Sequence, residues 1–146
     1  MNEVERVIRE RVGSSAFANW FGMEFATFGD GECEIRLPLQ PHHLNPGGII
    51  HGGVIATLLD AAIGLALRTK LGLGSQHVTL NLNIQYIGMA TGGTVVAKGK
   101  SVHPGRRAAY GEAVLESDDG RLLAKATATF MIVAPEQLPH TPFPKP

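Results

Sequence analysis

Asp60 is the residue of this chain whose surroundings most need a chemical explanation. It lies within the longest apolar stretch of the sequence, residues 52–67, which reads GGVIATLLDAAIGLAL. An ionised carboxylate among apolar side chains is costly unless it is paired, hydrogen-bonded or functional. On a helix, Asp60 would share its face with four small residues, Gly53, Ala56, Thr57 and Gly64. The pattern predicts either a reactive carboxylate beside a pocket or a buried structural carboxylate that caps or bridges loop amides.

A second candidate feature leads into the same helix, in the segment 45–53 with the sequence NPGGIIHGG. The first amides of a helix lack internal partners, and the helix dipole makes that end attractive to negative charge. Gly52 and Gly53 leave these amides unshielded, so a substrate carbonyl could approach closely, as stabilisation of an oxyanion requires. The alternative is a glycine-rich turn that serves backbone torsion alone. The Gly-Lys-Ser/Thr ending of a P-loop is missing, and so is a Rossmann fingerprint.

Helical spacing prevents Gly52 and Asp60 from acting together within one chain. They are eight residues apart, which is about 12 Å along a helix. An oxyanion donor and a general base must both lie within roughly 3 Å of the reacting atoms. If both groups serve one site, the helix end of one subunit must meet Asp60 of another. A symmetric dimer with two equivalent sites then follows.

Other chemistries have weaker support in the sequence. Six histidines are present, but His42 and His43 are adjacent, the others are scattered, and no His-Glu-x-x-His run exists, so we expect no metal. The single cysteine, Cys33, excludes an intramolecular disulfide and a cysteine metal cluster. Its place in an alternating segment without a basic neighbour favours packing over nucleophilic catalysis.

Composition narrows the class of protein further. The chain has 146 residues, with 13 Lys and Arg against 13 Asp and Glu, which argues against a nucleic-acid or anionic-membrane surface. Charged residues make up only 18%, against roughly 25% in an average soluble domain. We therefore expect part of the surface to be covered by another subunit. The N-terminus has no apolar signal core, and the longest apolar stretch is too short to span a membrane, which predicts a soluble cytoplasmic protein.

Periodicity predicts the elements that position these residues. Helical spacing indicates a helix within 1–13, a second short helix that Ser14 or Ser15 caps, and a long helix over 52–70. The long helix is apolar all round and must be enclosed on most sides. Alternation predicts strands at 23–27, 33–37, 78–86, 94–103, 107–116 and 122–133. Within 78–86 strict alternation places Thr79 on the polar face.

Short connections between successive strands indicate an antiparallel sheet, because parallel neighbours would need long crossovers. The predicted architecture is α+β, with a curved antiparallel sheet wrapped around one long central helix. We expect a single domain over residues 1–134. Residues 135–146 hold five of the nine prolines and are expected to form an extended tail.

The residues Asn45, His51-Gly52-Gly53 and Asp60, followed by VTLNLNI from Val78, resemble the hot-dog-fold acyl-CoA thioesterases. The PaaI-like branch of phenylacetate degradation, related to the 4-hydroxybenzoyl-CoA thioesterases, has the most similar spacing, Asn-x5-His-Gly-Gly-x6-Asp. The similarity covers residues 15–134 and is strongest over 44–90. It implies hydrolysis of an acyl- or aryl-acyl-CoA to the free acid and CoA. CoA would be part of the substrate, with no further cofactor, and the enzyme would be a homodimer paired into a dimer of dimers.

The resemblance implies a catalytic role for five residues. The Gly52 amide would polarise the thioester carbonyl, while Asn45 and His51 orient the substrate or the glycine loop. Asp60 of the partner subunit would activate water as a general base or attack directly as a nucleophile. Thr79 matches a Ser or Thr that positions the water in some members.

The resemblance also suggests residues that bind the substrate. Gly53 and Asn81 are expected to contact the substrate, although many relatives carry Asp where this chain has Asn81. Arg106 and Arg107 follow a Pro-Gly turn and are candidates for the CoA phosphates, because arginine suits phosphate geometry; ordinary solvated charge is the alternative. The aromatic residues Trp20, Phe21 and Phe25 either line the acyl pocket or close the core.

Two other functions remain open at this point. A non-catalytic acyl-CoA-binding hot-dog module would bind the same ligand without turnover, but pure binding has no use for a buried base beside His-Gly-Gly. Hot-dog hydratases usually pair Asp with His in an Asp-x4-His motif. Here the fifth residue after Asp60 is Leu65, which disfavours a hydratase.

Overall fold

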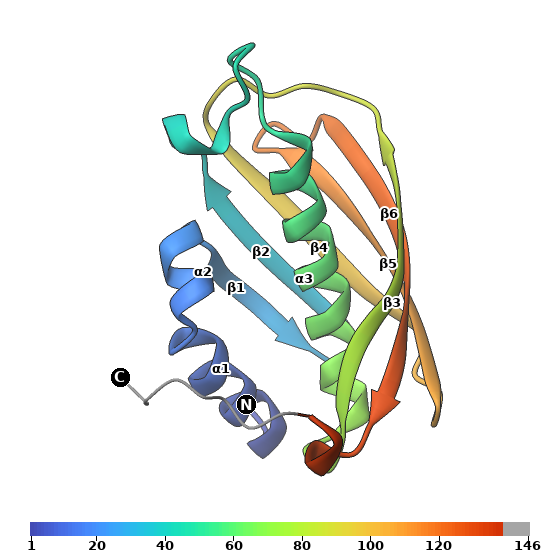
Figure 1. Cartoon of the computed structure of the whole chain (residues 1–146). Helices are drawn as coiled ribbons and strands as arrows, with labels where there is room; N and C mark the ends of the chain where they lie inside the picture. The colour runs from blue at the N-terminus through green and yellow to red at the C-terminus, as the bar shows by residue number, and fades with distance from the viewer. Residues whose placement is uncertain (139–146) are drawn as a thin grey trace.

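The computed structural model describes residues 1–138, in which six strands form one sheet beside a long helix. The elements in chain order are α1 (Glu3–Gly13), α2 (Ala16–Phe21), β1 (Glu24–Gly29), β2 (Glu32–Pro38), η1 (Pro41–His43), α3 (Gly52–Leu71), β3 (Gln76–Tyr86), β4 (Thr94–His103), β5 (Ala108–Ser117), β6 (Leu122–Val133) and η2 (Pro135–Gln137). The strand order is β1-β2-β4-β5-β6-β3, and every pairing is antiparallel. Figure 1 shows the sheet curving around α3, with α1 and α2 beside β1. The predicted α+β architecture, a curved antiparallel sheet around one central helix, is confirmed.

The central helix α3 begins at Gly52, with His51 as its N-cap, and ends before Gly72, whose φ of +75° favours glycine. Leu58, Leu59 and Ile63 are fully buried, as expected for a helix that is apolar on all sides. The helix backbone touches the sheet directly at β4, where a Cβ on Gly99 would lie 2.2 Å from the Ala62 carbonyl oxygen. Small residues are therefore required where helix and sheet meet.

The inner face of the sheet supplies the rest of the core. Alternate residues of β2, β4, β5 and β6 point toward α3 and are buried: Ile35, Leu37, Val95, Ala97, Leu115, Ala124, Ala126 and Ala128. The alanines of β6 leave room beside the helix, as their alternation in the sequence suggests.

The edge strand β3 carries an irregularity that the sequence pattern did not predict. Its register with β6 shifts between Thr79 and Asn81, so Leu80 is an extra residue and is 61% exposed. Thr79 pairs with Phe130, whose side chain is in the core, whereas Asn81 pairs with Thr129. The prediction that Thr79 lies on the polar face is therefore wrong, because the bulge reverses the alternation and turns Thr79 toward α3.

The chain ends pack around this core. The N-terminal helix α1 has a capping box between Asn2 and Glu5, and Ser15 caps α2. At the other end Pro135–Gln137 form a 3-10 turn, and the remainder of the predicted extended tail, from residue 139, lies outside the described residues. Within residues 1–138 no helix combines the length and the apolar character that a bilayer crossing requires.

Candidate active site

Asp60 lies at the middle of α3 and faces the inner side of β3. The Thr79 hydroxyl donates a hydrogen bond to Asp60 Oδ1 over 2.8 Å. Asp60 is only partly buried, because the side chains that follow it on the same face are small. The carboxylate is therefore held by one defined neighbour and is open to a reacting group on its other side.

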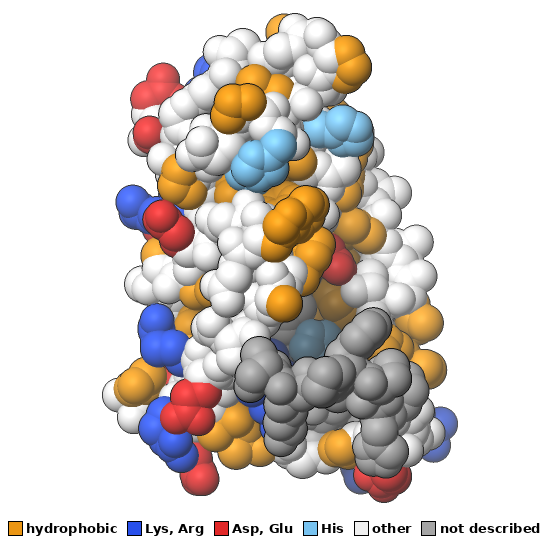
Figure 2. Space-filling model, turned by 60° about the vertical axis from the view of Figure 1, so that its left-hand side comes forward, with side chains coloured by type: hydrophobic (Ala, Val, Ile, Leu, Met, Phe, Trp, Pro, Cys, Tyr) orange, Lys and Arg blue, Asp and Glu red, His pale blue; other side chains and the backbone are white. Residues whose placement is uncertain are grey.

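A cavity of about 510 Å³ lies beside this carboxylate. Asp60, Thr57, Ala61 and Gly64 of α3 form one wall, which confirms the pocket that the small residues predicted. Leu65 of α3 also lines the cavity, and the facing walls come from other parts of the chain: Val12, Ser15, Phe17, Ala18, Met23, Phe25, His77, Thr79 and Phe130. Figure 2 looks onto the face formed by α1 and α2, where hydrophobic side chains surround a hollow. Such a cavity can hold an apolar group next to the carboxylate.

The aromatic candidates divide between cavity, core and surface. Phe25 lines the cavity, whereas Phe21 is buried in the core and Trp20 is exposed. Phe17, which is not among these candidates, also lines the cavity and contacts the Phe21 ring at a centroid distance of 5.6 Å.

The start of α3 presents one free backbone donor. His51 Nδ1 accepts a hydrogen bond from the Gly53 amide over 2.8 Å, and the His51 carbonyl accepts from the Val54 and Ile55 amides. The Tyr86 hydroxyl donates to the Gly52 carbonyl over 3.0 Å. Among the hydrogen bonds of residues 1–138, none uses the Gly52 N–H. This amide is therefore free to donate to a ligand, as an oxyanion donor must be.

Asn45 shapes the loop that leads to this amide. Its Oδ1 accepts hydrogen bonds from the Gly47 amide over 2.9 Å and from the Ile49 amide over 3.3 Å. The backbone of Asn45 adds two bonds across the same loop, to Gly48 and Ile49. Asn45 therefore fixes the loop conformation before His51 caps the helix.

Three predicted binding residues lie away from the Asp60 cavity within one chain. Asn81 follows the bulge and is on the face of β3 opposite to Thr79. Arg106 and Arg107 are exposed in the turn between β4 and β5. None of the three lines the cavity, and Gly53 uses its amide for His51. Gly52 itself starts α3, eight residues before Asp60, so one chain holds the two reactive groups apart.

His77 is a residue of this site that was not predicted from the sequence. It lines the cavity, and its ring lies against Phe130 at a centroid distance of 5.1 Å. Burial, with a smaller effect from the Arg68 charge, lowers the pKa of His77 to about 4. The ring is therefore neutral at physiological pH. Its position two residues before Thr79 on the same strand face was the available signal.

The other histidine and cysteine side chains have structural surroundings. His43 is buried, accepts from the Gln40 amide and donates to the Phe21 carbonyl over 2.7 Å. Cys33 lies in the core, and burial raises the pKa of its thiol to about 12, which disfavours the thiolate. Within the described residues no group of three or more His, Cys, Asp and Glu gathers around a possible ion, and the expectation of no cofactor stays a prediction.

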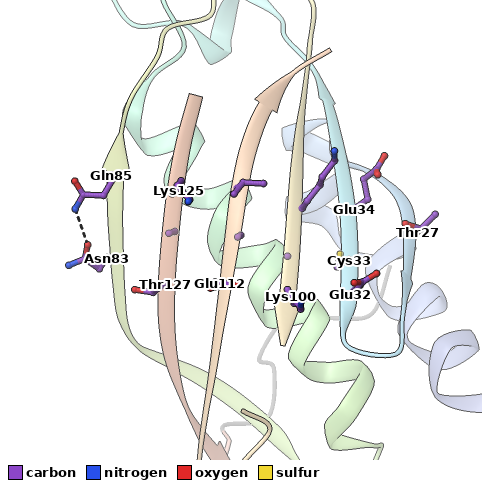
Figure 3. A pocket seen from close by; sticks show the side chains of 15 residues that line it. Thr27, Glu32, Cys33, Glu34, Asn83, Gln85, Lys100, Glu112, Lys125 and Thr127 are labelled. Carbon is purple, nitrogen blue, oxygen red and sulfur yellow. Dashed lines mark hydrogen bonds between the residues drawn. The ribbon is translucent and has the colours of Figure 1, made fainter. Parts of the chain in front are cut away.

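A second cavity, of about 620 Å³, lies on the sheet face opposite to α3 (Figure 3). Positively charged lysines and negatively charged glutamates line it, together with amide side chains such as Asn83 and Gln85. Lys98, one of these, is paired with Glu116 over 2.9 Å. No predicted catalytic residue lines this cavity, so the chemistry is assigned to the side of Asp60.

Comparisons with known proteins agree with this geometry. Residues 47–124 match the family model described as the thioesterase superfamily. The chain is 31% identical over 134 residues to the medium/long-chain acyl-CoA thioesterase YigI of Salmonella typhimurium, an alignment that covers 80% of this chain and 84% of the relative.

Solved structures show the same fold. A conserved protein of Pseudomonas aeruginosa is 36% identical, with a TM-score of 0.79 over 84% of this chain and 98% of that one. A thioesterase family protein of Silicibacter pomeroyi superposes with a TM-score of 0.84 at 23% identity, over 90% of this chain and 98% of the other.

Proposed function

The chain belongs to the thioesterase superfamily and has its hot-dog fold, and from this premise we propose that it hydrolyses acyl- or aryl-acyl-CoA thioesters. The products are the free acid and CoA. The observation that carries this proposal is the Asp60 carboxylate, hydrogen-bonded to Thr79 and open to an apolar cavity. The activity in the name of the Salmonella relative supports acyl-CoA as the substrate class.

In the proposed reaction the acyl group occupies the cavity and brings its carbonyl carbon next to Asp60. Asp60 takes a proton from water while the water oxygen attacks the carbonyl carbon, and the tetrahedral intermediate then expels CoA as its thiolate, which takes up a proton. In the alternative course Asp60 attacks directly, and water then hydrolyses the mixed anhydride. The Thr79 hydroxyl holds one oxygen of the carboxylate in either course. A base, water and an oxyanion donor suffice, so the proposal includes no metal or redox cofactor.

The oxyanion donor in this proposal is the Gly52 amide of a second copy of the chain. Gly52 and Asp60 are about 12 Å apart on one helix, so a single subunit does not complete the site. The outer edge of β3 pairs with no strand among the described residues, and exposed apolar side chains follow this edge: Leu80, Ile87 and Met89. Such a surface suits a two-fold contact with the same surface of another copy.

Several finer assignments are part of the same proposal. Asn45, His51, Gly52, Gly53 and Asp60 match the PaaI-like spacing, which supports membership of that branch. Branch membership implies a dimer of dimers in the cytoplasm. The CoA phosphates are then bound by Arg106 and Arg107, the exposed basic residues at the β4–β5 turn. The alternative is that these two side chains are ordinary solvated charges.

Steady-state hydrolysis of an acyl-CoA panel tests the proposed function. We expect wild type to release thiol from at least one medium-chain or aryl-acyl-CoA, and Asp60→Ala to lower kcat/KM by roughly a thousandfold or more. A non-catalytic binding module would instead bind acyl-CoA in calorimetry and release no thiol over hours. Full activity of Asp60→Ala on every cleaved substrate would contradict the assignment of the base.

A further inference from the structure

Three residues of α3 face three residues in or next to β3, in a regular series that begins with Asp60 and Thr79. On α3 the residues four apart share one side of the helix, and on β3 the residues two apart share one face. The facing pairs are Asp60 with Thr79, Gly64 with His77, and Arg68 with Ser75, which directly precedes β3. A Cβ on Gly64 would lie 3.1 Å from His77 Nε2, and Arg68 Nη1 donates to the Ser75 carbonyl. The ladder of pairs therefore leads from Asp60 past His77 to Arg68.

The far end of this ladder holds a positive charge that has no counter-ion among residues 1–138. Arg68 is only 5% exposed, and it takes part in none of the ion pairs of residues 1–138. In the described part of the chain its Nη2 has no hydrogen-bond partner, and neither has His77 Nδ1, although both atoms are buried. The charge of Arg11 also reaches Arg68 and, after burial, helps to lower its pKa. Buried charges and polar atoms are normally paired, so two neighbouring orphans indicate a missing anionic partner.

Of these two side chains, His77 lines the cavity of the proposed active site, and Arg68 lies behind the lining residues. Thr79 and Asp60 lie at its reactive end, while Gly64 and His77 line it one turn further along α3. Phe17, Phe25 and other apolar side chains form the walls between. Arg68 follows on the next turn, about 12 Å along the helix axis from Asp60. An acyl chain bound at Asp60 would thus cross an apolar passage and bring its far end to His77 and Arg68.

Resting on the proposed function, we propose that the substrates are dicarboxylyl-CoA thioesters, whose distal carboxylate is bound by Arg68 and His77. One carboxylate oxygen accepts from Arg68 Nη2–H. The other accepts from Nδ1–H of a His77 imidazolium, because Nε2–H already faces Gly64 and the bound carboxylate stabilises the second proton on Nδ1. The carboxylate neutralises the buried guanidinium and satisfies both orphaned atoms. A distal hydroxyl could satisfy the same two atoms, but it would leave the charge of Arg68 uncompensated.

Matched pairs of thioesters test this substrate class. Adipoyl-, suberoyl- and sebacoyl-CoA are compared with hexanoyl-, octanoyl- and decanoyl-CoA, and a distal-hydroxy analogue of each length is included. We expect at least one dicarboxylyl-CoA to exceed its plain partner in kcat/KM by roughly tenfold or more, mainly through KM. Equal rates, a preference for every plain chain, or a preference for the hydroxy analogue would each overturn the inference.

Variants of the two residues separate the distal site from the catalytic pair. Arg68→Met and His77→Phe should bring the ratio of kcat/KM for suberoyl- and octanoyl-CoA close to one. The matched control is His103→Phe, which changes an exposed histidine of β4 and should leave that ratio as in wild type. A ratio that stays high in both Arg68→Met and His77→Phe would contradict the assignment.

A binding measurement on unaltered wild type needs neither turnover nor a folded variant. Calorimetry should show that suberate binds and octanoate binds at least tenfold more weakly. If no thioester is cleaved but suberate binds selectively, the proposed hydrolysis fails and the ligand class stands. If plain acyl-CoA is cleaved in an Asp60-dependent way and suberate binds no better than octanoate, only the distal site fails.

Discussion

At the scale of single residues, the Asp60–Thr79 hydrogen bond determines how the carboxylate is presented. Thr79 occupies Oδ1, and no other hydrogen bond of residues 1–138 involves the Asp60 side chain. The second oxygen is therefore available to water or to a carbonyl carbon. A hydrogen bond to a charged group is worth roughly 1.5–3 kcal/mol, which is enough to affect the rate measurably.

Removal of the Thr79 hydroxyl should lower activity without removing the base. We expect Thr79→Val to reduce kcat/KM roughly 10- to 100-fold, the kinetic equivalent of one charge-assisted hydrogen bond. Thr79→Ser keeps the hydroxyl and should restore most of the rate. Equal activity of the Val and Ser variants in steady-state assays would show that the hydroxyl does not position Asp60.

His77 makes folding stability depend on pH. Its pKa in the folded protein is about 4, mainly because of burial, against an ordinary value of 6.5. Between these values the unfolded chain binds the proton and the folded chain does not, so stability falls as pH falls from about 6.5 toward 4. The loss is at most roughly 3 kcal/mol. In urea unfolding across this pH range, the free energy of unfolding of His77→Phe should change less with pH than that of wild type. An equal pH dependence of the two proteins would count against this account.

At the scale of elements, α3 is set against the sheet by direct backbone contact at Gly99. A Cβ there would clash with the Ala62 carbonyl, which belongs to helix backbone and cannot rotate away. We expect Gly99→Ala to destabilise the fold by about 1–3 kcal/mol or more. Gly92→Ala is the matched control, because nothing lies within 4 Å of its added methyl. Chemical denaturation compares the two, and an equal midpoint for both variants would argue against the close contact.

The same elements show what local patterns can predict. The long helix and the alternating strands follow from apolar spacing, because enclosure of α3 and burial of one sheet face dictate that spacing. The bulge at Leu80 does not follow from it. Alternation in β3 assigns Val78 and Leu80 to the inner face, but pairing with β6 and the Thr79–Asp60 bond turn Thr79 inward instead. Such long-range contacts leave no trace in a window of nine residues.

Like the fold, the candidate site was predicted only in part from the sequence. Asp60 and the glycine segment stand out because a carboxylate and bare amides are unusual in an apolar helix. His77 and Arg68 do not stand out, since only the packing of β3 on α3 brings them to the same side. Asn81 was placed among the substrate-binding residues by resemblance, but it lies on the outer face of β3, because the bulge turns Thr79 inward and leaves Asn81 outside.

At the scale of the whole molecule, each chain carries both halves of the proposed site but holds them on separate turns of α3. The free edge of β3 and its exposed apolar side chains supply a contact surface for a second copy. Assembly and activity should therefore be lost together.

A charge placed on this edge tests that link. We expect Leu80→Glu with Met89→Glu to shift the protein toward monomer in light scattering, because both side chains are exposed in the single chain. Hydrolysis should fall in proportion to the loss of dimer. Val102→Glu introduces the same charge at an exposed apolar position of β4 and serves as the control. A fully active monomer would contradict a shared site.

Complementation between two inactive subunits tests the central claim most directly. Asp60→Ala removes the carboxylate, and Gly52→Pro removes the amide hydrogen at the first helical position, where proline is tolerated after the extended backbone of His51. Each homodimer should be inactive. The purified mixed dimer contains one site with Asp60 from one chain and the Gly52 amide from the other, and it should show about half of the wild-type kcat per dimer. A verified mixed dimer with no activity above the two parents would contradict catalysis across the interface.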